Sequence, residues 1–183
     1  MTKKLGSIIA LGIVALLAVV VVILYLIPVN YAPKLSEPNS IIVHQSSTKN
    51  GTFLKENDEK KYNKIMQEFN DSLTRNLLSA IFAGQSSGGT NVADKGILPS
   101  VPPESITDAD VKIVLTYDAH TLKINGKTQP RKVTNVIYQL SNTKTYQPAT
   151  IYFQQEDGTH YYEYKTFALQ TNLYNYIMDL EIA

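Results

Sequence analysis

The sequence predicts a membrane-anchored α+β protein. An N-terminal transmembrane helix is followed by a small domain, in which a long amphipathic helix packs on a four- or five-stranded antiparallel sheet and a short C-terminal helix closes the chain. Three observations lead to this prediction. Leu5–Ile27 is a run of twenty-three residues without a charge. Residues 57–83 repeat apolar side chains at three- and four-residue steps, which is the spacing of a helix. From Ile106 onward the apolar period changes to two, which is the spacing of half-buried strands.

The first segment, Leu5–Ile27, is long enough to cross a bilayer. At ~1.5 Å per residue it makes a helix of ~35 Å, against a hydrocarbon core of ~30 Å. Its many Leu, Ile and Val residues favour insertion by about 5–10 kcal/mol as an upper bound. A strand would leave its backbone amides unpaired in lipid, so a helix is favoured. A cleaved signal peptide has a shorter apolar core and a small-x-small cleavage site, which the residues after Pro28 do not provide, so we predict an uncleaved anchor.

The flanking charges predict the orientation of this helix. Lys3 and Lys4 lie directly before it, whereas Lys34 is the one basic residue close after it. The positive-inside tendency therefore places residues 1–4 in the cytoplasm and the C-terminal domain outside the cell membrane. A tail of that size cannot carry an enzymatic or signalling domain. Residues 28–40 contain three prolines and are predicted to form an extended stalk, with residues 41–183 as the extracytoplasmic domain.

Charge and cysteine content exclude several function classes. The chain has 17 basic and 16 acidic residues, and without Lys3 and Lys4 the outer part has a net charge of −1. A nearly neutral domain lacks the basic surface of a nucleic-acid binder. The absence of cysteine excludes disulfides, a thiol nucleophile and a thiolate metal site. A cysteine-free outer domain is more typical of a bacterial or archaeal surface than of a eukaryotic one.

Between residues 41 and 103 the pattern predicts a hairpin, a helix and a loop. Residues 41–43 and 52–54 are expected to pair as short strands around an Asn50-Gly51 turn. The helix over Asn57–Ala83 begins with Asn57 as its N-cap and stops at Gly84. Its last turns, residues 77–83, are apolar nearly all round, which favours deep burial over a docking surface for a partner or the membrane. Residues 85–103 are rich in Gly, Ser and Pro and form a long loop without a phosphate-binding motif.

The rest of the chain is predicted to be strands and a short helix. Val111–Tyr117 alternates apolar and polar side chains, as a strand with one buried face does. Asn125-Gly126 and Glu156–Thr159 are tight-turn sequences between strands. The further strands expected are Val133–Leu140, Thr150–Gln154 and His160–Phe167, and Thr171 is expected to cap the final helix.

No motif for catalysis or metal binding is present. His44, His120 and His160 lack metal-ligand spacing, and surface positions are the simpler interpretation. Asp108 and Asp110 precede a strand and could bind calcium or act as acid and base, but a solvated turn is favoured. No serine nucleophile elbow occurs. We therefore predict no enzyme activity, no metal and no cofactor, and the alternative is a cell-envelope hydrolase that uses Asp108/Asp110 or a histidine.

The twelve tyrosines, in a chain without tryptophan, suggest where a partner would bind. Tyr161, Tyr162 and Tyr164 lie on the last hairpin, and an exposed cluster there could stack on sugars or anchor a protein. Sheet packing explains strand tyrosines more simply. The predicted function is a membrane-anchored extracytoplasmic binding or assembly module. It contacts lipid through Leu5–Ile27 and has another membrane or envelope protein as its partner; a structural subunit of a larger envelope complex is a second alternative.

Two tripeptides match the N-glycosylation sequon. They are Asn50-Gly51-Thr52 and Asn70-Asp71-Ser72. The match is informative only in a host whose secretory pathway attaches such glycans. The second tripeptide falls in the middle of the predicted helix.

Overall fold

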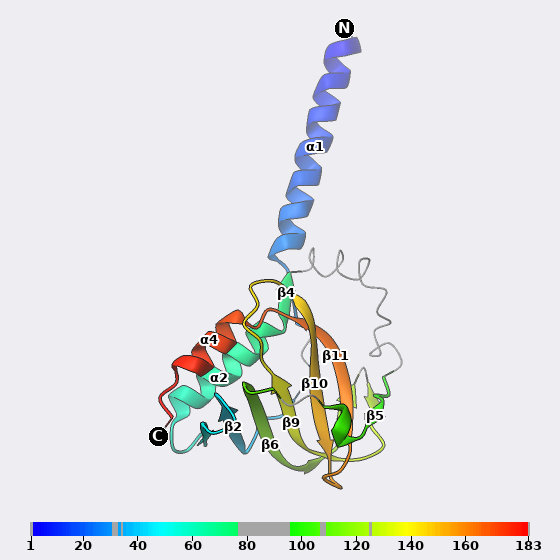
Figure 1. Cartoon of the computed structure of the whole chain (residues 1–183). Coiled ribbons are helices and arrows are strands. Elements are labelled where there is room, and N and C mark those ends of the chain that lie inside the picture. Colours follow the sequence, from blue (N-terminus) through cyan, green and yellow to red (C-terminus); the bar gives the residue numbers. More distant parts are fainter. Residues whose placement is uncertain are drawn as a thin grey trace. The chain divides into compact units, whose positions relative to one another are not determined.

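The computed structural model describes residues 2–30, 33, 35–76, 96–106, 109–124 and 126–182, except for the side chains of 2–9, 29, 30 and 105. Within this part the protein is α+β, with a large antiparallel sheet and three α-helices, as predicted (Figure 1). The chain divides into two compact units. The first contains α1 (Thr2–Leu26), β1 (Pro28–Asn30) and β4 (Thr74–Asn76), and the second contains the sheet and the other helices.

In the described part of the first unit, helix α1 leads into a pair of short strands. α1 has 25 residues. β1 and β4 pair antiparallel, with Pro28 opposite Asn76 and Asn30 opposite Thr74. The segment predicted as a stalk therefore begins with a paired strand. Among the described residues, whose side chains in α1 begin at Ala10, no helix is both long enough and apolar enough to cross a membrane.

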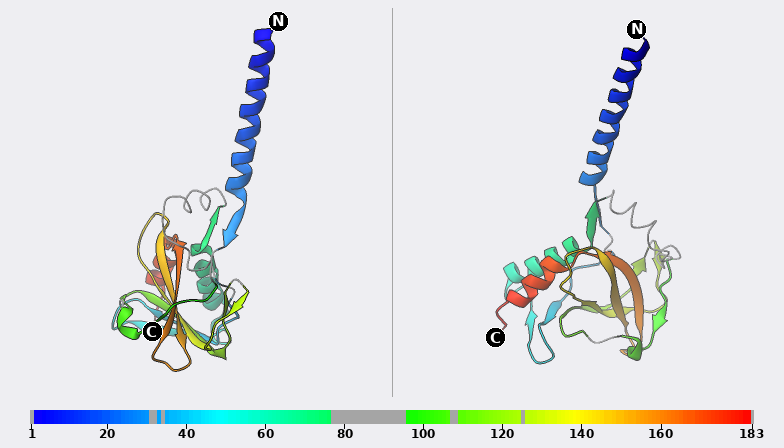
Figure 2. Two further views of the ribbon diagram at one scale, coloured as in Figure 1. Left: turned by 90° about the vertical axis from the view of Figure 1, so that its right-hand side faces the viewer. Right: turned by 45° about the horizontal axis from the view of Figure 1, so that its top comes forward.

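The second unit is built on a seven-stranded antiparallel sheet with the order β3-β2-β6-β9-β10-β11-β5 (Figures 1 and 2). The separate strands β7 and β8 form a two-stranded hairpin. The strand bounds are β2 Ser40–His44, β3 Asn50–Phe53, β5 Ser100–Val101, β6 Lys112–His120, β7 Lys123–Ile124, β8 Lys127–Thr128, β9 Val133–Gln139, β10 Gln147–Gln155 and β11 Tyr161–Ala168.

The prediction of four or five strands was wrong because two pairings join distant parts of the chain. The β2–β3 hairpin docks beside β6, with Val43 opposite Ile113. β5 pairs with β11 at the other edge, with Val101 opposite Tyr161. Local alternation identifies a strand, but it does not identify a partner strand that lies far away in the sequence.

Tight turns connect several neighbouring strands of the second unit. The Gly126 and Gly158 hairpins were predicted correctly, and both glycines have positive φ (+78° and +72°), as tight hairpin turns require. Asn125 lies outside the described residues. The first hairpin differs from its prediction because its turn spans residues 45–49, where Gln45 N–H donates to Lys49 O (2.9 Å), so that Asn50 and Gly51 belong to β3.

Helix α2 spans Glu59–Ser72, so the prediction of a helix over residues 57–83 was wrong at both ends. Asp58 caps it in place of Asn57, and its Oδ1 accepts from Lys61 N–H (3.1 Å). At its end the Ser72 hydroxyl donates back to Phe69 O (2.7 Å), a local bond that competes with helix continuation. The chain then enters β4. Residues 77–95, including the apolar run 77–83, Gly84 and most of the loop 85–103, lie outside the described part.

Helix α4 (Thr171–Asp179) lies beside α2, and both cover the same face of the sheet (Figure 2). Gln170 occupies its N-cap position without a capping side chain, so Thr171 is the first helical residue and not the predicted cap. Phe69 of α2 packs edge-to-face on Tyr138, with 5.4 Å between ring centroids. The fully buried core of this face includes Ile41, Tyr62, Ile65, Ile113, Leu115, Val136, Ile151, Phe153, Leu173 and Ile177.

Candidate functional site

The face of the sheet opposite the helices carries a row of apolar side chains that crosses four strands. The register places Ile42 opposite Val114, Val114 opposite Ile137, and Ile137 opposite Tyr152. Tyr152 is 8% exposed and the other three side chains are half-buried. We call these four residues the open-face row. Their alignment follows from the strand period of two, which sends every second residue to this face.

Polar side chains flank the open-face row on both sides. One flank consists of His44, Lys112 and Gln139, which are cross-strand neighbours. On the other flank, Asn135 Nδ2 donates to Gln154 Oε1 (2.6 Å), and Gln154 Nε2 donates to the Tyr161 hydroxyl (3.2 Å). The face therefore has an apolar centre with a hydrogen-bonded polar edge.

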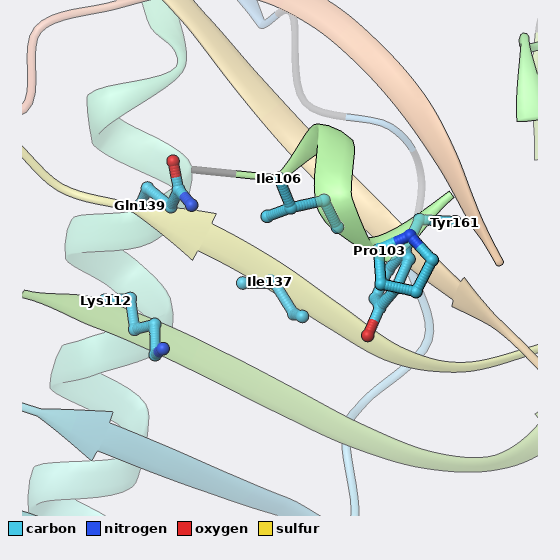
Figure 3. Close-up of a pocket in the computed structure, with 6 residues that line it drawn as sticks. All are labelled: Pro103, Ile106, Lys112, Ile137, Gln139 and Tyr161. Carbon is cyan, nitrogen blue, oxygen red and sulfur yellow. The ribbon is translucent and has the colours of Figure 1, made fainter. Parts of the chain in front are cut away.

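A small hollow opens on this face between the sheet and the 3₁₀ helix η2 (Pro103–Ser105), as Figure 3 shows. Its volume is about 210 Å³, below the roughly 300–1,000 Å³ of pockets for drug-sized ligands. The space suits one inserted side chain. It is lined by Pro103, Ile106, Lys112, Ile137, Gln139 and Tyr161, which provide one amine, one amide and one phenol around apolar carbon atoms.

The three tyrosines of the predicted partner surface lie on two different faces of the sheet. Tyr161 is half-buried on the open face and lines the hollow. Tyr162 is 3% exposed in the core, and its hydroxyl accepts from Arg131 N–H (2.8 Å). Tyr164 packs against the core, with its ring centroid 6.4 Å from that of Phe153. Of the three, Tyr161 belongs to the candidate site.

The other candidate residues are spread over the domain. His44 is half-buried on the open face, whereas the ring of His120 packs on Tyr117 at 4.8 Å between centroids. Asp110 is exposed, and Asp108 lies outside the described residues. Within the described part, no three His, Asp or Glu side chains lie close enough to hold a metal ion.

His160 belongs to a polar cluster at the β10–β11 turn. Asp157 Oδ1 accepts from the backbone N–H groups of Thr159 (2.9 Å) and His160 (3.1 Å), and the Arg131 guanidinium donates to Oδ2. The hydrogen bonds from Thr159 and His160, with that from the Thr159 N–H the largest contribution, lower the pKa of Asp157 to about 2. The cluster is exposed and organises the turn.

Buried glutamines hold separate segments of the fold together, and the sequence pattern did not identify them. Gln45 Nε2 donates to Ile177 O (2.6 Å) and Leu180 O (2.7 Å) and so holds the end of α4. Gln129 binds the 96–98 segment through both its amide atoms. One signal was available: Gln45 directly follows β2 and continues the alternation of the inward residues Ile41 and Val43.

Comparison of the chain with protein-family models, curated proteins and solved structures gives no match.

Proposed function

We propose that the chain is a single-pass membrane protein, anchored by Leu5–Ile27, whose domain of residues 41–183 lies outside the cell and binds another membrane or envelope protein through the open face. The observation that carries this proposal is the exposure of α1. From Leu11 to Ile27 large apolar side chains are exposed on all sides of the helix, with exposed fractions from 41% at Ile27 to 75% at Leu11. A helix that is apolar all round is suited to a lipid surrounding.

The sequence before Ala10 supports the same proposal. Leu5–Ile9 adds five uncharged residues before Ala10, so that the apolar length reaches ~35 Å at ~1.5 Å per residue. Tyr25, near the other end, is 60% exposed, and tyrosine is favoured at the membrane interface. Lys3 and Lys4 supply the cytoplasmic charge.

The binding role is supported by the composition of the open face. Protein interfaces commonly have an apolar or aromatic centre and a polar rim. The open-face row supplies the centre and its two flanks supply the rim. In this proposal an apolar side chain of the partner enters the hollow beside Ile137 and Tyr161.

The binding role is preferred to the hydrolase alternative. Acid–base hydrolysis requires paired titratable groups in a cleft. Among the residues that the structure describes, the lining of the hollow contains one amine and no carboxyl group. The proposal therefore includes no catalytic step, no metal and no cofactor.

Cysteine labelling tests the anchor and its orientation. The chain has no cysteine, so the unmodified protein is the blank for single-cysteine variants. Asn142→Cys, at an exposed position of the domain, should react with a membrane-impermeant maleimide in intact cells. Thr2→Cys should react only after lysis. The opposite labelling would reverse the orientation, and recovery of the protein without detergent would contradict the anchor.

A crosslinking pull-down from intact cells tests the binding face. Ile137→Asp should abolish capture of the partner, whereas Asn142→Asp adds the same charge at an exposed position between β9 and β10, outside the open-face row and its flanks, and should not. Tyr161→Ala should weaken capture in a folded protein. Equal capture by Ile137→Asp and the unmodified chain would contradict the proposed face. Recovery of the partner at fixed ratio without crosslinker would favour a permanent structural subunit.

A further inference from the structure

We propose that Asn50 is the acceptor of an N-linked glycan and that Asn70 is not, although both belong to a sequon. The inference rests on the proposed extracytoplasmic location of the domain. It is carried by the different backbone conformations of the two tripeptides. Asn50-Gly51-Thr52 lies in β3, and Asn70-Asp71-Ser72 lies in the last turn of α2.

In β3 both reactive side chains are available together. The sequon requires a carboxamide and a hydroxyl two residues later. Residues i and i+2 of a strand point to the same face, so the side chains of Asn50 and Thr52 lie on one side of β3. Both residues are exposed. Gly51 between them is packed, since a Cβ at this position would lie 2.7 Å from Ile182 Cγ2.

The backbone of this tripeptide is also accessible, because β3 is an edge strand of the sheet that the described residues form. Gln45 N–H donates to Lys49 O, and hydrogen-bonded pairs alternate along an antiparallel hairpin. Gly51 and Phe53 therefore form the next hydrogen-bonded pairs, each with the residue opposite it on β2. The N–H and C=O groups of Asn50 and Thr52 point away from β2, so an enzyme can approach both the backbone and the side chains without displacing a strand.

The second sequon fails on each of these points. In a helix, residues i and i+2 are rotated by about 200° and point in opposite directions. Asn70 Nδ2 already donates to Met66 O (2.9 Å). Ser72 is 4% exposed, and its hydroxyl donates to Phe69 O (2.7 Å). Its hydroxyl cannot take part in recognition unless the end of α2 unfolds.

The reaction requires a lipid-diphosphate-linked oligosaccharide and the transferase of the host. Asn50 Nδ2 attacks the anomeric carbon of the sugar and forms the N–C glycosidic bond. The bond from that carbon to the diphosphate oxygen breaks, and the lipid diphosphate leaves with the electron pair. Nδ2 loses one proton. The attached glycan would cover the β3 edge, whose outward backbone groups could otherwise pair with a second chain.

Peptide mass spectrometry of the full chain tests the proposal. The protein is made in cells that have an N-glycosylation pathway, and its glycans are released by amidase in heavy-oxygen water. Released sites then carry the heavy isotope, and a parallel sample kept in heavy-oxygen water without the amidase measures spontaneous deamidation of Asn50-Gly51. We expect the label at Asn50 and not at Asn70. Asn50→Gln and Thr52→Ala should remove the glycan, and Asn70→Gln should leave it unchanged. An unmodified Asn50, or Asn70 modified to the same extent, would overturn the proposal.

A third acceptor separates this proposal from the proposed orientation. An Asn-Gly-Thr tripeptide is added after Ala183 on a flexible linker. If the added site is glycosylated and Asn50 is not, the orientation stands and the inference about Asn50 is overturned. If neither site is glycosylated, the domain did not cross the membrane, and the orientation and the inference fall together.

Discussion

The two faces of the sheet use the same strands and similar residues, yet their exposure differs. On the covered face, a cross-strand row of Ile41, Leu115, Val136 and Phe153 has 0% exposure at every position. One residue along each strand, the open-face row of Ile42, Val114, Ile137 and Tyr152 remains half-buried at three of its four positions. The difference arises from α2 and α4, which pack on one face. An apolar residue on either face therefore indicates that a contact is favourable there, but only the face covered by α2 and α4 makes that contact within the chain.

The largest effect is expected from truncation on the covered face. Phe153→Ala should lower the free energy of unfolding by about 3–5 kcal/mol, because it leaves a cavity in the packed core. Ile137→Ala, on the open face of the neighbouring strand, should cost about 1 kcal/mol or less, because its side chain is only half-buried. Urea unfolding of the full chain in detergent, followed by circular dichroism, measures both. Equal costs would remove the distinction between the two faces.

A polar residue on the covered face should have the next largest effect. Gln45→Ala removes the side-chain donor of the Leu180 carbonyl and one of the two donors of the Ile177 carbonyl, which keeps its bond from Leu180 N–H. It should lower the free energy of unfolding by about 1–3 kcal/mol. Gln154→Ala removes an amide from the open face, where water can replace it, and should cost less. The same unfolding measurement compares them. A larger loss for Gln154→Ala would contradict the role given to Gln45.

The adjacent tyrosines of β11 allow the two faces of the sheet to be compared by removing a single hydroxyl group from each. Tyr162→Phe removes the acceptor of Arg131 N–H in the core and should lower the free energy of unfolding by about 0.5–1.5 kcal/mol. Tyr161→Phe should change stability by less, because its hydroxyl lies at the half-buried open face. It should reduce partner capture instead. A stable Tyr162→Phe together with a destabilised Tyr161→Phe would exchange the two assignments.

The smallest effect is expected at the exposed turn, which belongs to neither face. The pKa of Asp157 is lowered from 3.8 to about 2 by hydrogen bonds to its charged form. A lowered pKa stabilises the fold above the unfolded value, and this contribution is lost as the pH falls through the folded value. The stability difference between the unmodified chain and Asp157→Asn should therefore shrink between about pH 4 and pH 2. Unfolding curves at several pH values measure it, and a constant difference would contradict the assignment.

Local sequence patterns were sufficient for the elements that depend on neighbouring residues. Alternation at Ile113, Leu115 and Tyr117 predicted β6, and the turn sequence around Gly158 predicted the β10–β11 hairpin. The helical spacing of Tyr62, Ile65 and Phe69 predicted the buried face of α2. In each of these cases, the period of the pattern equals the geometric period of the element.

The sequence did not reveal the features that depend on distant residues. The end of α2 was missed because Phe69 and Leu73 have helical spacing, while the competing bond of the Ser72 hydroxyl and the pairing of β4 with β1 have no local signal. Tyr161 and Tyr162 are the same residue type, and their faces follow from the register with β10. The open-face row was not identified, because it exists only once β2, β6, β9 and β10 are placed side by side.

The order of the strands in the sheet has a consequence for the kinetics of folding. β9, β10 and β11 pair with their neighbours in sequence, so their loops close at low entropic cost. β2 must instead pair with β6 across α2 and the segment that follows it, and contacts between such distant residues slow folding. We expect the β9–β10–β11 meander to form in the transition state and the β2–β3 hairpin to dock later. Val136→Ala should then slow refolding, whereas Val43→Ala should mainly accelerate unfolding.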